Sequence, residues 1–158
     1  MIRTEHRIWL CRILIILNLA VIWGNSLLCG AESGQMSGGI VAFVMELLGI
    51  PDSASDFVHL LIRKLAHLTE FACLSALMCW HFGMVKEKMS YQCLLPVLLA
   101  MAAALTDETI QLYTPDRGPS LVDVWIDTLG ATLGMSAVQL VRHLKKKESK
   151  HLFGGNIT

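Results

Sequence analysis

Residues 93–113 read CLLPVLLAMAAALTDETIQLY, an apolar stretch that includes two adjacent acids, Asp107 and Glu108, near its end. Its length matches the roughly 20 apolar residues that a helix needs to cross the hydrocarbon of a bilayer. A charged side chain costs about 2.5–3.5 kcal/mol at the centre of such a helix, so acids inside it need partners or a function. The stretch therefore predicts a transmembrane helix that carries a functional site near one end.

Three further apolar stretches have a similar length. The four predicted spanning helices cover residues 8–28, 65–84, 93–113 and 121–140. We expect an all-α polytopic membrane bundle, with one domain over residues 1–142 and a basic cytoplasmic tail over residues 143–158. Between the first two spans, a helix over residues 40–48, ended by Pro51, would lie in the membrane interface or form a short soluble helix over the bundle.

The composition agrees with a membrane protein. Apolar residues make up 54% of the chain and charged residues 16%, which is more apolar than a typical soluble domain. The net charge is zero, so the total points to no nucleic-acid partner. The five cysteines are scattered, mostly within apolar runs, and form no C-x-x-C pair, which favours small buried side chains over zinc or redox chemistry.

The basic residues are distributed unevenly about the predicted spans. Ten of the thirteen Lys and Arg residues lie on the side that holds both termini. The positive-inside rule makes that side cytoplasmic. The acids show the opposite bias, since only Glu5, Glu87 and Glu148 fall on that side. We therefore expect a multi-pass protein of the cell membrane with both termini in the cytoplasm.

Three of the predicted spans carry ionisable residues near their outer ends. Because alternate helices run in opposite directions, these groups fall at the same depth in the membrane. Spacings of three or four residues place the members of each group on one face of their helix. The predicted outward-facing site contains Lys64, His67, Glu70, Asp107, Glu108, Gln111, Asp123 and Asp127.

The last span and the turn before it carry two further features. Gly130 and Gly134 lie below Asp127 in a small-x-x-x-small pattern, which lets a helix approach its neighbour closely. The turn over residues 113–120 is stiffened by two prolines and holds Arg117 at the rim of the site. A guanidinium there can pair with an acid or grip the phosphate or carboxylate of a ligand.

The ordered set of polar residues resembles the VanZ-like family of bacterial membrane proteins. The resemblance rests on Arg63-Lys64-x-x-His67-x-x-Glu70-Phe71, Asp107-Glu108-x-x-Gln111, Arg117, Asp123, Asp127, Gly130 and Gly134, and it extends to Asn25-Ser26. The family is named for an accessory protein of a glycopeptide-resistance cluster, associated with teicoplanin resistance. The resemblance therefore implies a role in the cell envelope. Many members of the family carry Asn where this chain has Asp127.

The leading hypothesis is a site that binds an anionic cell-envelope molecule, such as a lipid-linked cell-wall intermediate or a glycopeptide-related ligand. The candidate substrate-binding residues are Lys64, Gln111, Arg117, Asp123 and Asp127. A histidine beside carboxylates can perform general acid–base work. The candidate catalytic residues are His67, Glu70, Asp107 and Glu108. Whether the protein is an enzyme stays open from the sequence.

Two alternatives use the same residues. His67-x-x-Glu70 with a neighbouring aspartate would offer nitrogen and oxygen ligands to a divalent metal ion, although one histidine is a small ligand set. In a non-enzymatic scaffold, assembly factor or small transporter, the polar residues would form a structural or proton-linked network. Four helices make a narrow bundle, so a carrier would have to form a homo-oligomer. Every interpretation keeps the lipid bilayer as the partner.

Overall fold

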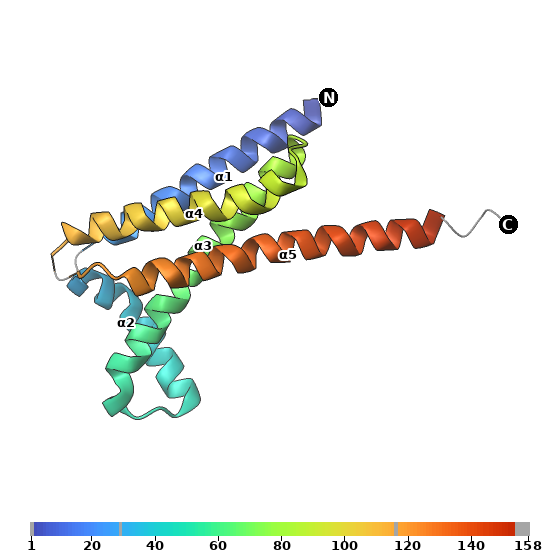
Figure 1. The fold of residues 1–158 in the computed structure, drawn as a ribbon. Helices are drawn as coiled ribbons and strands as arrows, with labels where there is room; N and C mark the ends of the chain where they lie inside the picture. The colour runs from blue at the N-terminus through green and yellow to red at the C-terminus, as the bar shows by residue number, and fades with distance from the viewer. Residues whose placement is uncertain (1, 29, 116, 154–158) are drawn as a thin grey trace.

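The computed structural model describes the backbone of residues 2–28, 30–115 and 117–153, and the side chains of residues 4–28, 38–115 and 117–148. Within these ranges the chain forms helices and turns without a strand (Figure 1). The elements are α1 (Ile2–Leu27), α2 (Gly30–Leu48), the 3₁₀ helix η1 (Asp52–Ala54), α3 (Ser55–Met84), α4 (Met89–Leu112) and α5 (Leu121–Phe153). The predicted all-α class is confirmed for these residues.

Helix α3 is the centre of the bundle. It packs against α1, α4 and α5 (Figure 1). Its Phe71, Leu74 and Met78 side chains are buried in the main core. Ile22 of α1 and the alanines of α4 around Ala104 complete this core. Lipid tails are as apolar as these side chains, so a close fit, and not the hydrophobic effect, would hold the helices together in a membrane.

Helix α5 approaches α3 closely at two glycines. A Cβ atom on Gly130 would overlap the backbone carbonyl of Leu68, and one on Gly134 would overlap the backbone carbonyl of Ala72. Backbone atoms within a helix cannot move aside cheaply, so these positions require glycine. The structure thus places both glycines of the small-x-x-x-small pattern at the α3–α5 contact.

Three helical segments are long and apolar enough to cross a membrane. They are Thr4–Leu27 of α1, Met89–Leu112 of α4 and Leu121–Glu148 of α5. Ile16, Leu94 and Trp125 are among their many exposed large apolar side chains, a surface that suits lipid better than water. The fourth expected span, in α3, is not among these segments because histidines and Glu70 lower its hydropathy.

All four helices extend beyond the spans that the hydropathy predicted, and α3 and α5 do so by the most residues. Helix α3 begins at Ser55, well before residue 65, and α5 continues past residue 140 to Phe153. Hydropathy marks only the part of a helix that suits lipid, whereas residues such as Lys and Glu continue a helix without difficulty. The first part of the predicted basic tail is therefore a continuation of α5.

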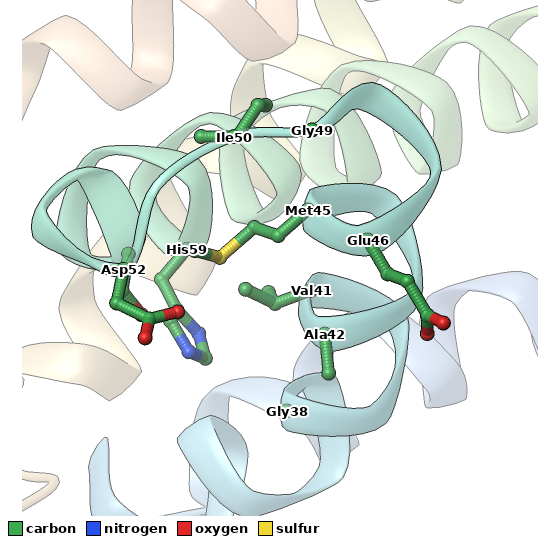
Figure 2. Close-up of a pocket in the computed structure, with 10 residues that line it drawn as sticks. Gly38, Val41, Ala42, Met45, Glu46, Gly49, Ile50, Asp52 and His59 are labelled. Atoms are coloured by element: carbon green, nitrogen blue, oxygen red, sulfur yellow. The ribbon is translucent and has the colours of Figure 1, made fainter.

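The first half of α3 pairs with α2 in a hairpin that projects from the side of the bundle (Figure 1). Val41 and Met45 of α2 are buried against Val58 of α3. Helix α2 ends in a Schellman motif, in which Gly49 has a φ of 63° and Ile50 N–H donates to the Met45 carbonyl. A groove runs along one side of the hairpin and is lined by both helices (Figure 2).

Candidate functional site

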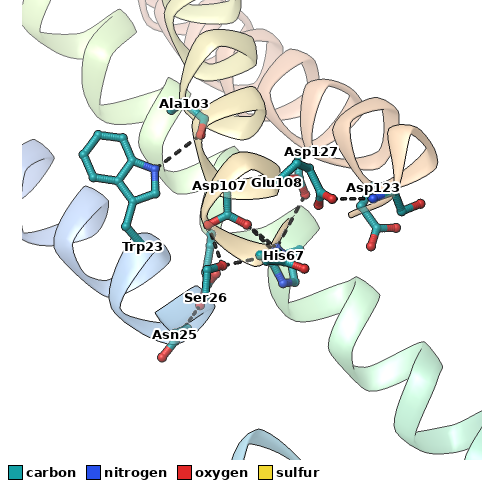
Figure 3. Close-up of polar contacts among 12 residues, drawn as sticks. Trp23, Asn25, Ser26, His67, Ala103, Asp107, Glu108, Asp123 and Asp127 are labelled. Atoms are coloured by element: carbon teal, nitrogen blue, oxygen red, sulfur yellow. Dashed lines mark hydrogen bonds and ion pairs between the residues drawn. The ribbon is translucent and has the colours of Figure 1, made fainter. Parts of the chain in front are cut away.

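Polar side chains from α1, α3, α4 and α5, together with the α4–α5 turn, meet at one end of the bundle (Figure 3). We call this group the polar cluster. Its members are Asn25, Ser26, Lys64, His67, Glu70, Asp107, Glu108, Gln111, Thr114, Arg117, Asp123 and Asp127. The nine site residues predicted from the sequence are all among them.

Asp107 lies at the fully buried centre of a network between α1 and α4. Its Oδ1 atom accepts a hydrogen bond from the Ser26 hydroxyl at 2.6 Å, and its Oδ2 atom accepts one from the Gln111 amide at 2.8 Å. The Gln111 amide also donates to Ser26 Oγ at 3.2 Å, and the Thr114 hydroxyl donates to the Ser26 carbonyl at 3.0 Å. This network joins α1 to α4, and Asp107 accepts hydrogen bonds at both of its oxygens.

His67 projects from α3 into the space between α4 and α5 (Figure 3). Its Nδ1 atom lies 4.0 Å from Asp107 Oδ2 and 3.9 Å from Asp127 Oδ1. Both separations exceed the length of a hydrogen bond. Nδ1 has no hydrogen-bond partner among the described residues. The imidazole is therefore close to two carboxylates without being bound to either.

Asp127 of α5 is buried with neither oxygen hydrogen-bonded to any described residue. Glu108 is satisfied on one side only: Oε2 accepts from the Ser120 N–H, while Oε1 has no such partner among the described residues. A buried acceptor left unsatisfied costs about 1–3 kcal/mol, and more when it is charged, so native structures keep few of them. The polar cluster therefore contains three carboxylate oxygens without a hydrogen bond, and one of them, Asp127 Oδ1, lies 3.9 Å from His67 Nδ1.

The rim of the polar cluster carries its basic groups. Lys64 of α3 forms an ion pair with Asp123 at the start of α5. Arg117 in the α4–α5 turn donates from Nη2 to the Asn25 carbonyl at 3.2 Å, and the Asn25 amide donates to Glu70 Oε1 at 3.0 Å. A narrow recess lies between α3 and α5, and with the side chains in these positions it is too tight to admit a water molecule. It is lined by Arg63, Lys64, His67, Asp123, Ile126 and Asp127.

The histidine and the glutamates of the polar cluster contact different partners. His67 approaches Asp107 and Asp127, whereas Glu70 bonds Asn25 and Glu108 bonds the Ser120 backbone. Residues three apart on a helix share a face, but their side chains here reach different neighbouring helices. Helical spacing predicted the shared location of these groups but not the helix that each one meets.

Four residues of the site were absent from the predicted set. Asn25, Ser26 and Thr114 are neutral, so the search for ionisable groups in apolar runs did not select them. Asn25-Ser26 was noted only within the family resemblance. Arg63 also lines the recess, a role that its position at the predicted membrane boundary did not indicate. The signal available for Ser26 was its depth, since the end of the first span faces the acids of the third.

The metal hypothesis gains no support from this geometry. Within residues 4–28, 38–115 and 117–148, no group of three or more His, Cys, Asp or Glu side chains is arranged to hold a metal ion.

A second polar contact lies at the opposite end of the bundle. Arg142 of α5 donates from Nη2 to the Cys79 carbonyl of α3 at 3.0 Å and from Nη1 to Gln92 Oε1 of α4 at 2.7 Å. Its guanidinium occupies the space that a Cβ atom on Gly83 would fill. Arg142 therefore joins three helices through a side chain whose donors are engaged.

The apolar helices and the buried polar cluster define the class as a helical membrane protein with a polar site between its helices. The sequence profile of the VanZ/LLP1 family matches residues 11–142, a range that contains the whole polar cluster. The chain belongs to this family. Neither a curated protein nor a solved structure matches it.

Proposed function

We propose that this chain is a four-span protein of the cell membrane, with both termini cytoplasmic, which binds an anionic cell-envelope molecule at its polar cluster. Family membership and three apolar helices support the membrane location. The uneven distribution of basic residues supports the orientation. In this orientation the polar cluster faces outward, so its ligand arrives from the outer side of the membrane.

The fourth span in this proposal is α3. The 20 residues from 65 to 84, which follow the pairing with α2, correspond to about 30 Å of helix, which matches the hydrocarbon thickness. His67 and Glu70 point towards neighbouring helices, and the exposed positions between residues 65 and 75 are Leu65, Ala66, Thr69 and Cys73. A helix that hides its charges inside the bundle shows lipid an uncharged surface, which supports a span despite the modest hydropathy.

The observation that carries the binding proposal is the set of buried carboxylate oxygens without hydrogen bonds, chiefly both oxygens of Asp127. A residue kept only for packing would be better apolar, because an unsatisfied buried carboxylate destabilises the fold. A polar atom beside two atoms 3.9 Å apart, such as His67 Nδ1 and Asp127 Oδ1, can lie within about 2.8 Å of both. These groups suit a hydroxyl or amine of the ligand.

The basic side chains at the rim complete the proposed site. Arg63 and Lys64 line the mouth of the recess, and Arg117 lies at the adjoining turn. They would hold a phosphate or carboxylate, while Asp127 and His67 accept hydrogen bonds from the rest of the ligand. Lipid-linked cell-wall intermediates combine an anionic diphosphate with hydroxyl groups, which makes them the substrate class that we favour.

If the protein is an enzyme, His67 is the proposed general acid or base. It lies between Asp107, whose orientation is fixed by Ser26 and Gln111, and the unbonded Asp127. Asp107, whose hydrogen bonds hold it in place, can orient the His67 imidazole. Asp127, which accepts no hydrogen bond from a described residue, can exchange a proton with that imidazole. Glu70 and Glu108 then serve as supporting groups because each is bonded to a structural partner.

The test of this function is binding and turnover of labelled lipid-linked intermediates by purified protein in vesicles. His67→Ala and Asp127→Asn should each weaken binding or remove turnover, with unchanged folding by circular dichroism. Asp56→Asn is the matched control, because Asp56 is an exposed acid outside the recess. Full binding by both site variants would contradict the proposal. A link to teicoplanin resistance predicts that wild type, but not these variants, raises the inhibitory concentration in a sensitive host.

Labelling of single cysteines, in a chain without the five native ones, tests the orientation. Cysteines at Asp52 and Gly118 should react with an impermeant maleimide added outside intact cells. A cysteine at Lys146 should react only after the membrane is opened. Outside labelling of Lys146, or protection of Gly118, would reject the proposed topology and with it the outward-facing site.

A non-enzymatic scaffold or assembly factor is the second candidate. It is favoured by the Ser26–Asp107–Gln111 network, which joins α1 to α4 as a purely structural network would. This candidate predicts that variants of the polar cluster lose stability and partner assembly together, without a separate effect on a small ligand. Crosslinking of the full chain in membranes would also reveal the homo-oligomer that a transporter of this size requires.

A further inference from the structure

The α2–α3 hairpin has two sides of opposite character. In α2, Ile40 and Leu47 lie seven residues apart, which places them on one face, and both are exposed. In α3, Phe57 and Leu61 lie four residues apart and are 66% and 45% exposed. None of the four lines the groove. They flank the buried contact on the side away from it.

The groove side has a largely apolar floor of Val41, Met45 and Ile50, and it carries ionisable side chains. Its lining includes Ala42 and Glu46 of α2, Asp52 before α3, and His59 of α3 (Figure 2). The 100° turn per residue of a helix rotates Glu46 about 100° away from Leu47, and His59 about 160° away from Leu61. The antiparallel pairing of the two helices then puts both apolar stripes on one side and the ionisable side chains on the other. The hairpin is amphipathic as a unit.

The apolar side continues onto the bundle. Along α3 the exposed stripe of Phe57 and Leu61 leads to Leu65, which is also exposed and lies beside the polar cluster. At the same end of the bundle, Leu121 and Trp125 of α5 are exposed as well. The hairpin projects sideways from α4 and α5 and does not extend them (Figure 1). The apolar surface is thus continuous with the surface of the spans.

We infer that the α2–α3 hairpin is a lipid-bound arm, with Ile40, Leu47, Phe57 and Leu61 on the acyl chains of the leaflet that contains the polar cluster. Continuity with the spans identifies the occupant as lipid, and the ionisable side chains on the opposite side give the arm a water-facing surface. The inference rests on the proposed membrane insertion of the bundle. It goes beyond that proposal by placing the apolar side of the arm against the acyl chains of one leaflet.

The arm also determines how a lipid-linked ligand reaches the recess. Arg63, at the end of the arm, is the first residue of α3 that lines the recess. A ligand whose chain lies in the same leaflet can therefore move laterally along the arm until its head group meets Arg63 and Lys64. Entry of this kind keeps the hydrocarbon part in the bilayer throughout.

Fluorescence quenching of the full chain in phosphatidylcholine–phosphatidylglycerol vesicles tests this inference. An environment-sensitive maleimide dye is attached to single cysteines at Leu47, Leu61, Ala42 or His59, in the background without native cysteines. Lipids with brominated acyl chains should quench the dye at Leu47 and Leu61 several-fold more than the dye at Ala42 and His59. Aqueous iodide should give the reverse order. Circular dichroism confirms that each labelled variant folds.

A dye at Leu98 of α4, an exposed apolar position in a span, separates the two proposals. If bromolipid quenches the dye at Leu98 while iodide quenches the dyes at Leu47 and Leu61, the lipid-bound arm is rejected and the membrane insertion of the bundle is kept. Shielding of Leu47 and Leu61 from both quenchers would also overturn it, because a protein surface would then cover the arm. Absence of lipid quenching at Leu98 would remove both proposals.

Discussion

The two ends of the bundle use polar residues in different ways. Near one end, Arg142 joins α5 to α3 and α4, and its guanidinium bonds the Cys79 carbonyl and Gln92. Near the other end, Asp127 is buried without a hydrogen bond to any described residue, and His67 lies near two acids without binding either. A satisfied polar contact stabilises a fold, whereas an unsatisfied one destabilises it and needs another reason to persist. The comparison therefore distinguishes the satisfied Arg142 contact from the unsatisfied carboxylates of the candidate site, while at the Arg142 end the buried atom without a hydrogen bond to a described residue is a histidine nitrogen, Nδ1 of His81.

Glycine substitutions should produce the largest effect in this comparison. Gly134→Ala places a methyl group against the Ala72 carbonyl of α3 and should cost about 2–4 kcal/mol, because backbone atoms must shift. Gly83→Ala meets only the flexible guanidinium of Arg142 and should cost about 1 kcal/mol. Unfolding in mixed micelles, followed by circular dichroism, measures both. Gly24→Ala, which meets nothing within 4 Å, is the control. Equal losses of unfolding free energy in Gly134→Ala and Gly83→Ala would contradict the close α3–α5 contact.

The Asp107 network should give the next largest effect. Asp107→Ala removes the acceptor of Ser26 and Gln111 in a fully buried position and should destabilise the protein by about 1–3 kcal/mol. A double-mutant cycle with Ser26→Ala should show a coupling energy of about 1 kcal/mol. Additive losses would mean that the bond from Ser26 to Asp107 contributes little, and that this part of the polar cluster is not structural.

Arg142 should have a smaller effect on stability and none on ligand binding. Arg142→Met keeps much of the side-chain volume, removes the bonds to Cys79 and Gln92, and should cost about 1–2 kcal/mol because the site is only half-buried. The dissociation constant for a lipid-linked intermediate, measured on the folded fraction, should stay within twofold of the wild-type value, because Arg142 lies at the other end of the bundle. A twofold change corresponds to about 0.4 kcal/mol of binding free energy. Loss of binding in this variant would break the division between the two ends.

Asp127 should show the smallest effect on stability and the clearest effect on function. Asp127→Asn preserves the shape of the side chain and removes a buried carboxylate that accepts no hydrogen bond from a described residue. The free energy of unfolding should therefore fall by less than about 0.5 kcal/mol, or should rise. Ligand binding should fall in the same variant. A loss of stability as large as that of Asp107→Ala would show that Asp127 has a structural role like that of its neighbour.

The sequence predicted the location of the site better than its contacts. Helical periodicity and hydropathy placed Lys64, Asp107 and Asp123 at the same depth in the membrane. The depth of a residue follows from the rise per residue of its helix and from the direction in which the helix runs. The same rules could not predict that His67 would meet Asp127, since this depends on the crossing of α3 with α5 at Gly130 and Gly134. Crossing geometry comes from packing of side chains across helices, which a single sequence does not encode locally.

The fold shows a similar division. The all-α class followed from the apolar runs, but the hairpin of α2 with the first half of α3 did not. Residues 55–64 include Asp56, His59 and Arg63, so their hydropathy did not predict a membrane span. Their packing against Val41 and Met45 is a tertiary contact, which local sequence patterns do not predict. The start of α3 at Ser55 was misplaced for this reason, and only the end of α5 at Phe153 lies further from its predicted position.

Helix α5 runs unbroken from Asp123 at the polar cluster, past Arg142, to Phe153. Its 33 residues extend for about 50 Å, whereas the hydrocarbon of a bilayer is about 30 Å thick. The basic residues between Arg142 and Phe153 therefore lie on a continuous helix and not on a flexible tail. A reporter fused after Phe153 would be carried rigidly with α5, so its rotational mobility would report any tilt of that helix when the recess is filled.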